Sequence, residues 1–261
     1  MPLPTGQTPK YLYRYCSVER AESLLTQGRV FFPCAMDFND PFDCGVKMVF
    51  NASRLKRERY NRELIRQKAP QMARRFRNRL ARKAADRESF EEAEKRFLSR
   101  VRRSVGILSM SARRDSLLMW SHYADKHAGL CLEFRRVGDF MVRALPVVYS
   151  LDYPELDFFQ VEGLVHREDE VGAAAQRRVV ERIYLSKSKD WEYEQEWRIV
   201  DPVAGRGFQP FPSEVLSGIT FGCRTSPDDQ RRVREWLGAH SVRLYQAHQN
   251  RRSYSLDFTE M

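Results

Sequence analysis

Acidic side chains recur at every second position in KSKDWEYEQEWRIV, residues 187–200. Glu192, Glu194 and Glu196 follow this spacing, and Arg198 continues it. Successive side chains of a strand point to opposite faces, so the spacing predicts a strand with these four residues on one face. Carboxylates two residues apart on a strand are about 7 Å apart. Their repulsion in a partly dry site raises the pKa of one, which suits it to proton transfer.

The residues between the glutamates indicate what the opposite face of this strand does. A strand would place them together on a core, whereas a helix would scatter them around its circumference. They are Trp191, Tyr193, Trp197 and Ile199. The same pattern also fits a solvated edge strand whose charges prevent aggregation, and both interpretations stay open at this point.

The rest of the sequence predicts the elements that position these side chains. Strands are expected at YLYRYC, RVFFP, VGILSM, GLCLEF, ITFG, VRLYQA and YSLDF. Helices are expected after Ser17, across DSLLMWSHYAD, over residues 171–185 and after Ser226. This order predicts an α+β fold around a bent or split mixed β-sheet.

The excess positive charge of the chain is concentrated in one segment. The 261 residues include 45 lysines and arginines and 35 aspartates and glutamates. Residues 54–103 hold 19 of the former and 7 of the latter, so this segment carries +12 and the remainder −2. No glycine occurs between Gly45 and Gly106. We expect a basic helical insertion over residues 51–104 within a single domain spanning residues 1–261.

Charge of a single sign favours an anionic partner, although a solvated helix face is the alternative. The cations of residues 54–103 can bind a phosphate backbone by counterion release. Aromatic residues are too few among them to indicate base stacking or sequence reading. We expect contact with nucleic acid without sequence specificity, or with a protein acceptor.

Other features exclude some classes of protein. No stretch reaches the roughly 20 apolar residues of a membrane span, and the N-terminal sequence has no apolar signal core. The five cysteines form no CxxC pair, which indicates reduced thiols and neither a disulfide framework nor a zinc site. We therefore expect a cytoplasmic protein with no membrane contact and no bound metal, and the sequence does not determine its oligomeric state.

Residues from three expected strands resemble the Arg–Ser–Glu signature of ADP-ribosyltransferases. They are, in chain order, Arg14 in the first strand, Ser109 and Ser111 at the end of a buried strand, and Glu194 with Glu196 on the late strand. The resemblance implies the bent or split sheet of that fold and NAD as the substrate that donates ADP-ribose.

The resemblance also implies a role for each of these side chains. Cleavage of NAD passes through an oxocarbenium-like transition state, which the ionised carboxylate of Glu196 would stabilise. Glu194 would orient or deprotonate the acceptor, and Arg14 would bind the pyrophosphate or a ribose. Ser111, and less directly Ser109, would hydrogen-bond the nicotinamide ribose or support the glutamate.

Two aromatic residues complete the expected site. Tyr123 and Trp120 would stack on nicotinamide, or pack in the core. Structural alternatives also stay open for Arg14, as an ion-pair partner, and for the serines, as turn formers. Arg198 is expected to neutralise the glutamates, and Glu192 to be an outer charge.

Longer motifs resemble a bacterial family known as domain of unknown function 2971, often met in abortive-infection and phage-defence loci. They are FNDPFD at 38–43, LMWSHYADKHAGLCLEF at 118–134 and KSKDWEYEQEWRI at 187–199. With ITFGCRTSPDD and YSLDF, they extend the resemblance over nearly the whole chain. It implies a context in defence, with a role as a toxin, and it implies no activity.

Two classes of function therefore stay open. The first is an NAD-consuming transferase that modifies a nucleic acid or a protein. The second is a nucleic-acid-binding sensor or a metal-dependent nuclease, in which Asp40 and Asp43 would join the glutamates around a divalent cation. Asn-Asp-Pro is also strong turn chemistry, which favours a structural loop at this position.

Overall fold

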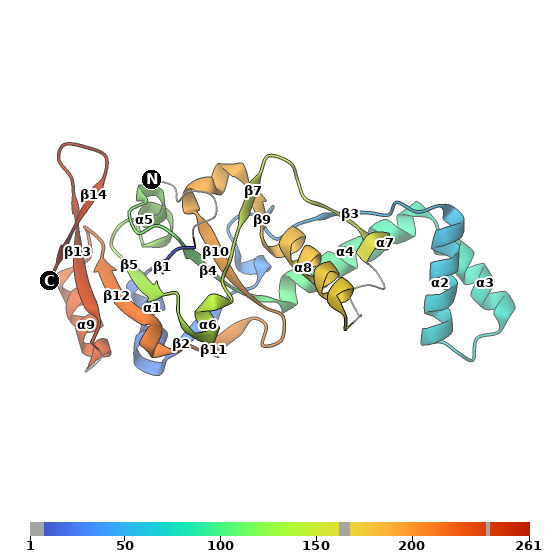
Figure 1. The fold of residues 1–261 in the computed structure, drawn as a ribbon, viewed down its shortest axis with the longest axis horizontal. Coiled ribbons are helices and arrows are strands. Elements are labelled where there is room, and N and C mark those ends of the chain that lie inside the picture. The colour runs from blue at the N-terminus through green and yellow to red at the C-terminus, as the bar shows by residue number, and fades with distance from the viewer. Residues whose placement is uncertain (1–7, 162–167, 239–240) are drawn as a thin grey trace. The chain divides into compact units, whose positions relative to one another are not determined.

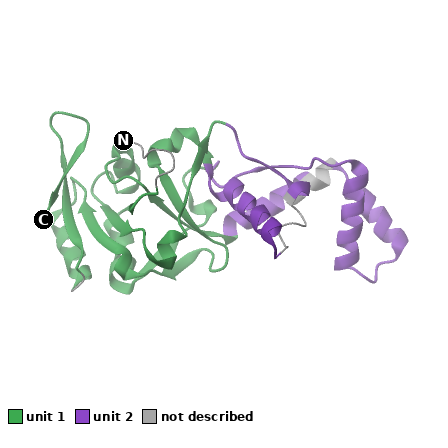
Figure 2. Ribbon diagram, viewed as in Figure 1, with its two compact units in different colours: residues 1–41, 104–151, 187–261 green, residues 42–103, 152–186 purple. Residues whose placement is uncertain are grey.

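The computed structural model describes residues 8–161, 168–238 and 241–261 (Figure 1). The chain divides into two compact units (Figure 2). Unit 1 comprises Met1–Pro41, Ser104–Leu151 and Lys187–Met261, and unit 2 comprises Phe42–Arg103 and Asp152–Ser186. That residues 1–261 fold as one domain stays a prediction.

The elements of unit 1 alternate between short strands and helices. They are β1 (Tyr11–Cys16), α1 (Val18–Gln27), β2 (Arg29–Phe32), η1 (Ala35–Asp37), β4 (Gly106–Ser111), α5 (Leu117–Tyr123), β5 (Leu130–Arg135), α6 (Gly138–Val142), β6 (Leu145–Pro146), β7 (Val148–Ser150), β9 (Ser186–Ser188), η2 (Lys189–Glu194), β10 (Glu196–Asp201), β11 (Gly207–Pro210), η3 (Ser213–Val215), β12 (Leu216–Phe221), α9 (Pro227–Leu237), β13 (Arg243–Gln249) and β14 (Leu256–Glu260). The first residue of β9 belongs to unit 2.

The large sheet of unit 1 has the strand order β14-β13-β12-β5-β1-β4-β10-β6. β12 and β13 run parallel, whereas the pairs of β1 with β4 and β5, and of β10 with β4, are antiparallel. The structure therefore confirms a mixed α and β fold with a large mixed sheet. The strands that carry the predicted arginine, serines and late glutamate, β1, β4 and β10, are neighbours in this sheet.

Local sequence signals set both ends of α1 and the start of α9 as predicted. The Ser17 side chain accepts a hydrogen bond from the Arg20 backbone N–H at the start of α1. Gly28 ends that helix with a φ of 59°, a left-handed conformation that costs glycine little. Ser226 begins α9 in the same way as Ser17, and Pro227 occupies the first turn.

The two faces of the sheet carry different hydrophobic clusters. On the first face, Leu12, Leu132 and Ile199 pack in one cluster with residues of α1 and α9. On the second face, Tyr15 and Cys131 pack with residues of α5. The alternation along each strand therefore decides which side chains meet, and the second face is the one that carries the candidate site.

Unit 2 contains the basic helices. Its elements are β3 (Lys47–Val49), α2 (Arg54–Lys68), α3 (Arg74–Lys83), α4 (Arg87–Ser104), β8 (Glu155–Asp157), α7 (Phe158–Val161) and α8 (Glu170–Tyr184), with the last residue of α4 in unit 1. β3 and β8 pair in parallel, and α8 confirms the helix expected over residues 171–185. None of the helices described in either unit combines the length and apolar character that crossing a membrane requires.

Gly106 begins the strand that carries the serines, and it tests how closely that strand is packed. A Cβ atom at this position would meet the backbone carbonyl group of Gly205. We expect Gly106→Ala to lower the free energy of unfolding by about 1–3 kcal/mol, measured by urea denaturation. An unchanged unfolding midpoint would show that this backbone approach does not constrain β4.

Candidate functional site

The acidic stretch is a strand only from Glu196 onward. Lys189–Glu194 form the 3-10 helix η2, which follows β9 with Ser188 as its N-cap. Gln195 then adopts a left-handed conformation with a φ of 45°. The expectation of one regular strand through Trp191 is wrong, because this left-handed residue interrupts the alternation between η2 and β10.

The turn at Gln195 brings four charged side chains together in an ion-pair cluster made of Lys187, Glu194, Glu196 and Arg198. The Arg198 guanidinium donates two hydrogen bonds to the Glu196 carboxylate, each 2.8 Å long. Lys187 Nζ lies 3.0 Å from Glu196 Oε2 and 2.5 Å from Glu194 Oε2. All four side chains are buried, and the cluster balances two positive with two negative charges.

The two carboxyl groups of the cluster differ in their proton affinity. Burial opposes the ionised form of Glu196, but the charges of Arg198 and Lys187 outweigh burial and lower its pKa to about 2. Burial raises the pKa of Glu194, and the nearby Glu196 carboxylate adds to this effect against the opposing Lys187. The cluster therefore pairs a carboxylate that stays ionised with one that accepts a proton more readily.

Tyrosines surround the two carboxyl groups. The Tyr123 hydroxyl donates to Glu194 Oε1 at 2.8 Å, and it accepts a hydrogen bond from the exposed Asn39 at 3.4 Å. The Glu196 backbone N–H donates to the Tyr149 hydroxyl at 2.7 Å. These contacts place Tyr123 between Glu194 and the surface.

The predicted separation of acidic and aromatic faces is wrong along most of this stretch. Glu192 is exposed and lies outside the ion-pair cluster, as its predicted outer position requires. Trp197 packs against the first-face cluster, whereas Tyr193 packs against the second-face cluster. Trp191 lies with its ring centroid 5.0 Å from Lys187 Nζ, a cation–π contact. The expected packing of alternate residues on one core therefore applies only to Trp197 and Ile199 in β10.

A lateral row of three residues crosses neighbouring strands beside the cluster. Tyr13 of β1 pairs with Ser111 of β4, and Ser111 pairs with Glu196 of β10. Paired residues in adjacent strands lie on the same face of a sheet, and the strands are about 4.8 Å apart. Tyr13, Ser111 and Glu196 therefore form one row on the second face.

Arg14 does not join this row, so its predicted meeting with the glutamates is contradicted. Arg14 pairs with Leu132, whose side chain belongs to the first-face cluster. Leu12, two residues before Arg14 and thus on the same face of β1, lies in the same cluster. Arg14 donates a hydrogen bond to the Ser109 carbonyl oxygen at 2.9 Å, and burial lowers its pKa. Its neighbour Tyr13 points to the second face, because side chains alternate along β1.

The predicted serines both support the glutamates. The buried Ser111 hydroxyl donates to the Glu194 carbonyl oxygen at 2.5 Å and accepts from the Arg113 backbone N–H at 3.0 Å. A hydrogen bond from the Ser109 side chain helps to keep the pKa of Glu196 low. Ser111 thus supports the backbone of Glu194 and also forms the turn after β4, whereas its contact with a nicotinamide ribose stays a prediction.

Trp120 does not fit its predicted contact with nicotinamide. Its side chain is fully buried, its Nε1 donates to the Arg114 carbonyl oxygen at 2.8 Å, and its ring contacts Tyr15 edge to face. It packs in the second-face cluster, which is the structural alternative.

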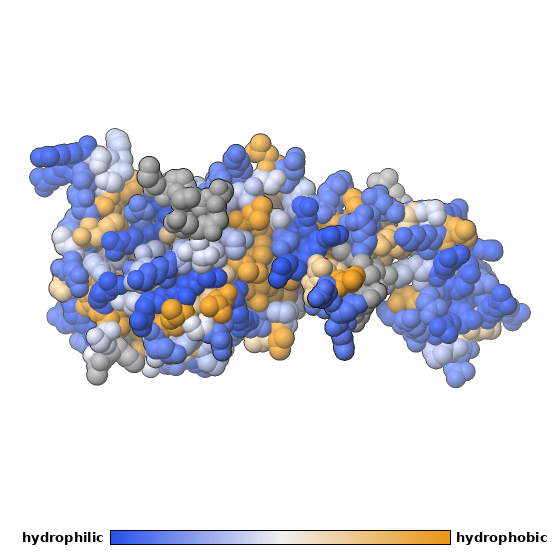
Figure 3. Space-filling model, in the orientation of Figure 1, coloured by the Kyte–Doolittle hydropathy of each residue, from blue (hydrophilic) through white to orange (hydrophobic). Residues whose placement is uncertain are grey.

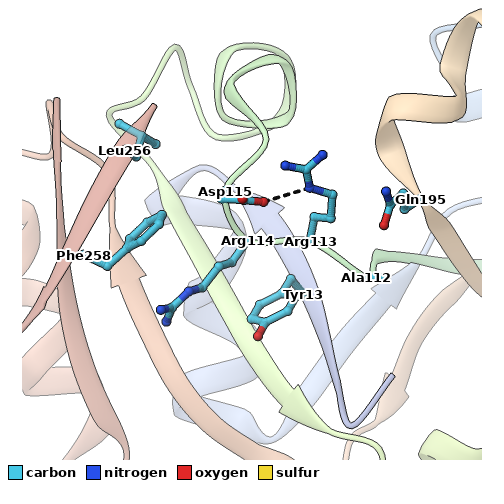
Figure 4. A pocket seen from close by; sticks show the side chains of 8 residues that line it. All are labelled: Tyr13, Ala112, Arg113, Arg114, Asp115, Gln195, Leu256 and Phe258. Carbon is cyan, nitrogen blue, oxygen red and sulfur yellow. Dashed lines mark hydrogen bonds and ion pairs between the residues drawn. The ribbon is translucent and has the colours of Figure 1, made fainter. Parts of the chain in front are cut away.

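A pocket of about 400 Å³ opens beside the row (Figure 4). Tyr13 lines it from β1, Phe258 from β14, and Gln195 from the turn before β10. The full lining consists of Tyr13, Ala112, Arg113, Arg114, Asp115, Gln195, Leu256 and Phe258. The Ala112 backbone N–H donates to the Gln195 carbonyl oxygen at 2.9 Å. Gln195 lies between Glu194 and Glu196 in the sequence, so this hydrogen bond links a wall of the pocket to the segment that carries the ion-pair cluster.

The two arginines of the pocket differ in their partners. Arg113 is paired with Asp115 at 2.8 Å, and this hydrogen bond lowers the pKa of Asp115. The Arg114 guanidinium lies 4.7 Å from the ring centroid of Phe258 and 5.3 Å from that of Tyr245. Among the described residues Arg114 forms no ion pair. The pocket thus combines aromatic rings with a cation whose charge no carboxylate balances.

The FNDPFD loop crosses the boundary between the units. Asp40 in unit 1 and Asp43 in unit 2 are both buried. Asp43 Oδ1 accepts a hydrogen bond from the Cys44 backbone N–H at 2.7 Å, a local contact typical of a structural loop. No group of three or more His, Cys, Asp or Glu residues in the described ranges is arranged to hold a metal ion.

Sequence reasoning missed several residues of the site. Lys187 stands at the start of the acidic stretch, and a lysine near three glutamates is a signal that it pairs with them. Arg113 and Arg114 follow two and three residues after Ser111, where β4 ends. Tyr149 and Phe258 gave no signal, because only the tertiary structure brings them to the site.

One family model matches part of the chain. Residues 119–199 match the family described as Protein of unknown function (DUF2971). The matched range covers most of α5, all of β5, the ion-pair cluster and nearly all of the motifs at 118–134 and 187–199, and it supports the resemblance to that family. Comparison with curated proteins and with solved structures gives no match.

The ion-pair cluster generates a prediction about stability. Glu196→Gln keeps the shape of the side chain but removes the carboxylate charge that Arg198 and Lys187 both contact. Breaking a buried ion pair in this way costs about 3–5 kcal/mol of unfolding free energy, which urea denaturation at neutral pH measures. The matched control Glu192→Gln, at an exposed position, should change the value by less than about 0.5 kcal/mol. Equal losses of unfolding free energy in the two variants would show that the ion pairs of Glu196 do not stabilise the fold.

The low pKa of Glu196 predicts how this difference depends on pH. The ordinary pKa of this group is 4.5 and the folded value is about 2, so the unfolded chain takes up the proton first as pH falls. The stabilisation is complete above about pH 4.5 and is lost as pH falls toward 2. The difference in stability between the wild type and Glu196→Gln should therefore shrink over this range, and a constant difference would refute the assignment.

Proposed function

We propose that the second face of the sheet binds NAD and transfers its ADP-ribose group to an acceptor. The observation that carries this proposal is the lateral row Tyr13–Ser111–Glu196 on three adjacent strands beside the pocket. It retains the serine and glutamate of the predicted signature and replaces Arg14 by Tyr13. The adjacency of β1, β4 and β10 supports the resemblance to the ADP-ribosyltransferase fold.

The pocket supports NAD as the ligand through its chemistry. Arg114 offers a guanidinium without a carboxylate partner, which suits the pyrophosphate. Tyr13 and Phe258 offer aromatic rings for a base or for nicotinamide. A volume of about 400 Å³ lies within the usual range of small-molecule sites.

In the proposed reaction, the bond between nicotinamide and C1′ of its ribose breaks, and nicotinamide leaves as a neutral molecule. Glu196 is ionised throughout the physiological range, so its carboxylate is available to the ribose hydroxyls and to the positive charge that develops on the ring. A ribose hydroxyl takes the position at Glu196 Oε2 that Lys187 now occupies at 3.0 Å. Lys187 keeps its closer contact with Glu194 in this step.

Glu194 is the proposed proton acceptor. A new bond forms between C1′ and the nucleophilic atom of the acceptor, and the proton of that atom passes to Glu194. Burial raises the pKa of Glu194, which brings it closer to the range in which a general base works well. Tyr123, hydrogen-bonded to Glu194, connects this carboxyl group to the exposed Asn39.

The acceptor class comes from the positive charge of residues 54–103, and the biological context comes from the sequence resemblance. We place the activity in bacterial defence against phage, in the cytoplasm, with a nucleic acid or a protein as the acceptor. The alternative class, a binding protein without this reaction, is supported by the basic helices of unit 2. No specific contact in the described residues favours a metal-dependent nuclease.

The proposal is tested by incubating the full chain with NAD labelled in its adenylate group and with RNA, DNA or cell lysate. Glu196→Gln should slow label transfer or NAD cleavage by about 10²–10³-fold, because it removes the charge near the ribose. Glu192→Gln should retain wild-type activity. Absence of both NAD binding and NAD cleavage in the wild type would overturn the proposal.

A second variant separates function from folding, since Glu196→Gln also weakens the structure. Arg114→Gln removes a half-buried guanidinium that holds no carboxylate, so the thermal midpoint should change little. The same change should weaken NAD binding by at least tenfold, measured by calorimetry, because the pyrophosphate loses its cation. Unchanged affinity for NAD would remove Arg114 and this pocket from the proposed site.

A further inference from the structure

Unit 2 presents a basic surface that the proposed reaction does not use. It is formed by α2 and α3, here called the basic pair, which pack against each other. Residues 54–83 contain 13 lysines and arginines but only two acidic residues, Glu58 and Glu63. Figure 3 shows the visible side of these helices as mostly hydrophilic.

Most of these cations are exposed and have no acidic partner. Among the described residues, Glu58 pairs with Arg54 and Arg82, and Glu63 pairs with Arg66. The exposed cations of the basic pair that form no ion pair are Lys56, Arg59, Arg62, Lys68, Arg74, Arg75, Arg79 and Lys83. A surface of this kind repels itself, so it gains free energy when an anionic polymer neutralises it.

The basic pair also buries very little of its own surface. Asn61 is the buried residue of α2, and Ala81 is that of α3. Phe76 is exposed, and the guanidinium carbons of Arg75 and Arg79 lie 4.8 and 5.6 Å from the centroid of its ring. An unpaired base would compete with these two cation–π contacts for the ring, and Tyr60 is the one other aromatic residue of residues 54–83, so this surface offers few platforms for base stacking.

We propose that the basic pair docks on duplex DNA through its phosphate backbone, without reading sequence. A DNA duplex carries one negative charge per about 1.7 Å, and its major groove, about 12 Å wide, admits an α-helix. The major groove of duplex RNA is deep and narrow, and single strands call for stacking rings. This inference does not depend on NAD chemistry, because no residue of the basic pair belongs to the pocket or to the ion-pair cluster.

The test measures how the full chain binds a fluorescent mixed-sequence DNA duplex of about 20 base pairs between 50 and 200 mM salt. The variant replaces Arg59, Arg62, Arg75 and Arg79 by glutamine. The control replaces four other exposed arginines outside the basic pair, Arg20, Arg177, Arg178 and Arg182, by glutamine. Both proteins lose four charges, and circular dichroism confirms that both retain the wild-type helix content.

Four lost phosphate contacts should reduce the slope of log affinity against log salt by about 3.6. The fall in affinity between 50 and 200 mM salt should then be about 100-fold smaller in the variant than in the wild type. The control should keep the wild-type slope within about one. Equal slopes for the variant and the wild type, or equal reductions in the variant and the control, would overturn the proposal.

The choice of duplex DNA is tested with other anionic partners. Duplex RNA of the same sequence, single-stranded DNA and vesicles with phosphatidylserine should each bind at least tenfold more weakly than the DNA duplex in the same buffer. Tighter binding of any of them would overturn the assignment of duplex DNA. Loss of DNA binding in the four-arginine variant with intact NAD cleavage would support this inference independently of the NAD proposal.

Discussion

The arrangement of the site depends on the neutralisation of two buried carboxylates by two buried cations. Neither Glu194 nor Glu196 could stay ionised in this position alone, since removing a charge from water costs several kcal/mol. Arg198 fixes one carboxylate from the same strand, and Lys187 ties both carboxylates to β9. The cluster therefore holds η2, the turn at Gln195 and β10 in one geometry.

That geometry determines what the neighbouring strands present. With Glu196 fixed, the register of β10 on β4 and of β4 on β1 places Ser111 and Tyr13 in one row. The strand end after Ser111 then delivers Arg113 and Arg114 to the pocket. The low pKa of Glu196 and the raised pKa of Glu194 follow from burial and from these same contacts. The interactions that hold the strands in place therefore also set the protonation of the two carboxyl groups.

Much of the fold follows from local signals in the sequence. Ser17, Gly28 and Ser226 mark helix boundaries that the structure confirms, because caps are determined by a few adjacent residues. The pattern of alternating charge identified Glu194, Glu196 and Arg198 as neighbours. It failed at Gln195, since a left-handed residue other than glycine has no clear sequence signal.

The prediction for Arg14 failed for a different reason. A strand was predicted correctly there, but which of two adjacent residues faces the site depends on the pairing of β1 with β4 and β5. The partners of Lys187 and the approach of Phe258 likewise depend on contacts between distant segments. Such tertiary contacts do not follow from spacing within a single strand.

The most direct measurement is a crystal structure of the full chain with NAD or a non-cleavable analogue bound. Our account predicts the nicotinamide ribose within hydrogen-bonding distance of Glu196 and the pyrophosphate against Arg114, with Tyr13 contacting the ligand. NAD bound away from the row Tyr13–Ser111–Glu196 would contradict it. So would a complex in which Lys187 keeps its contact with Glu196 and no atom of the ligand reaches that carboxylate.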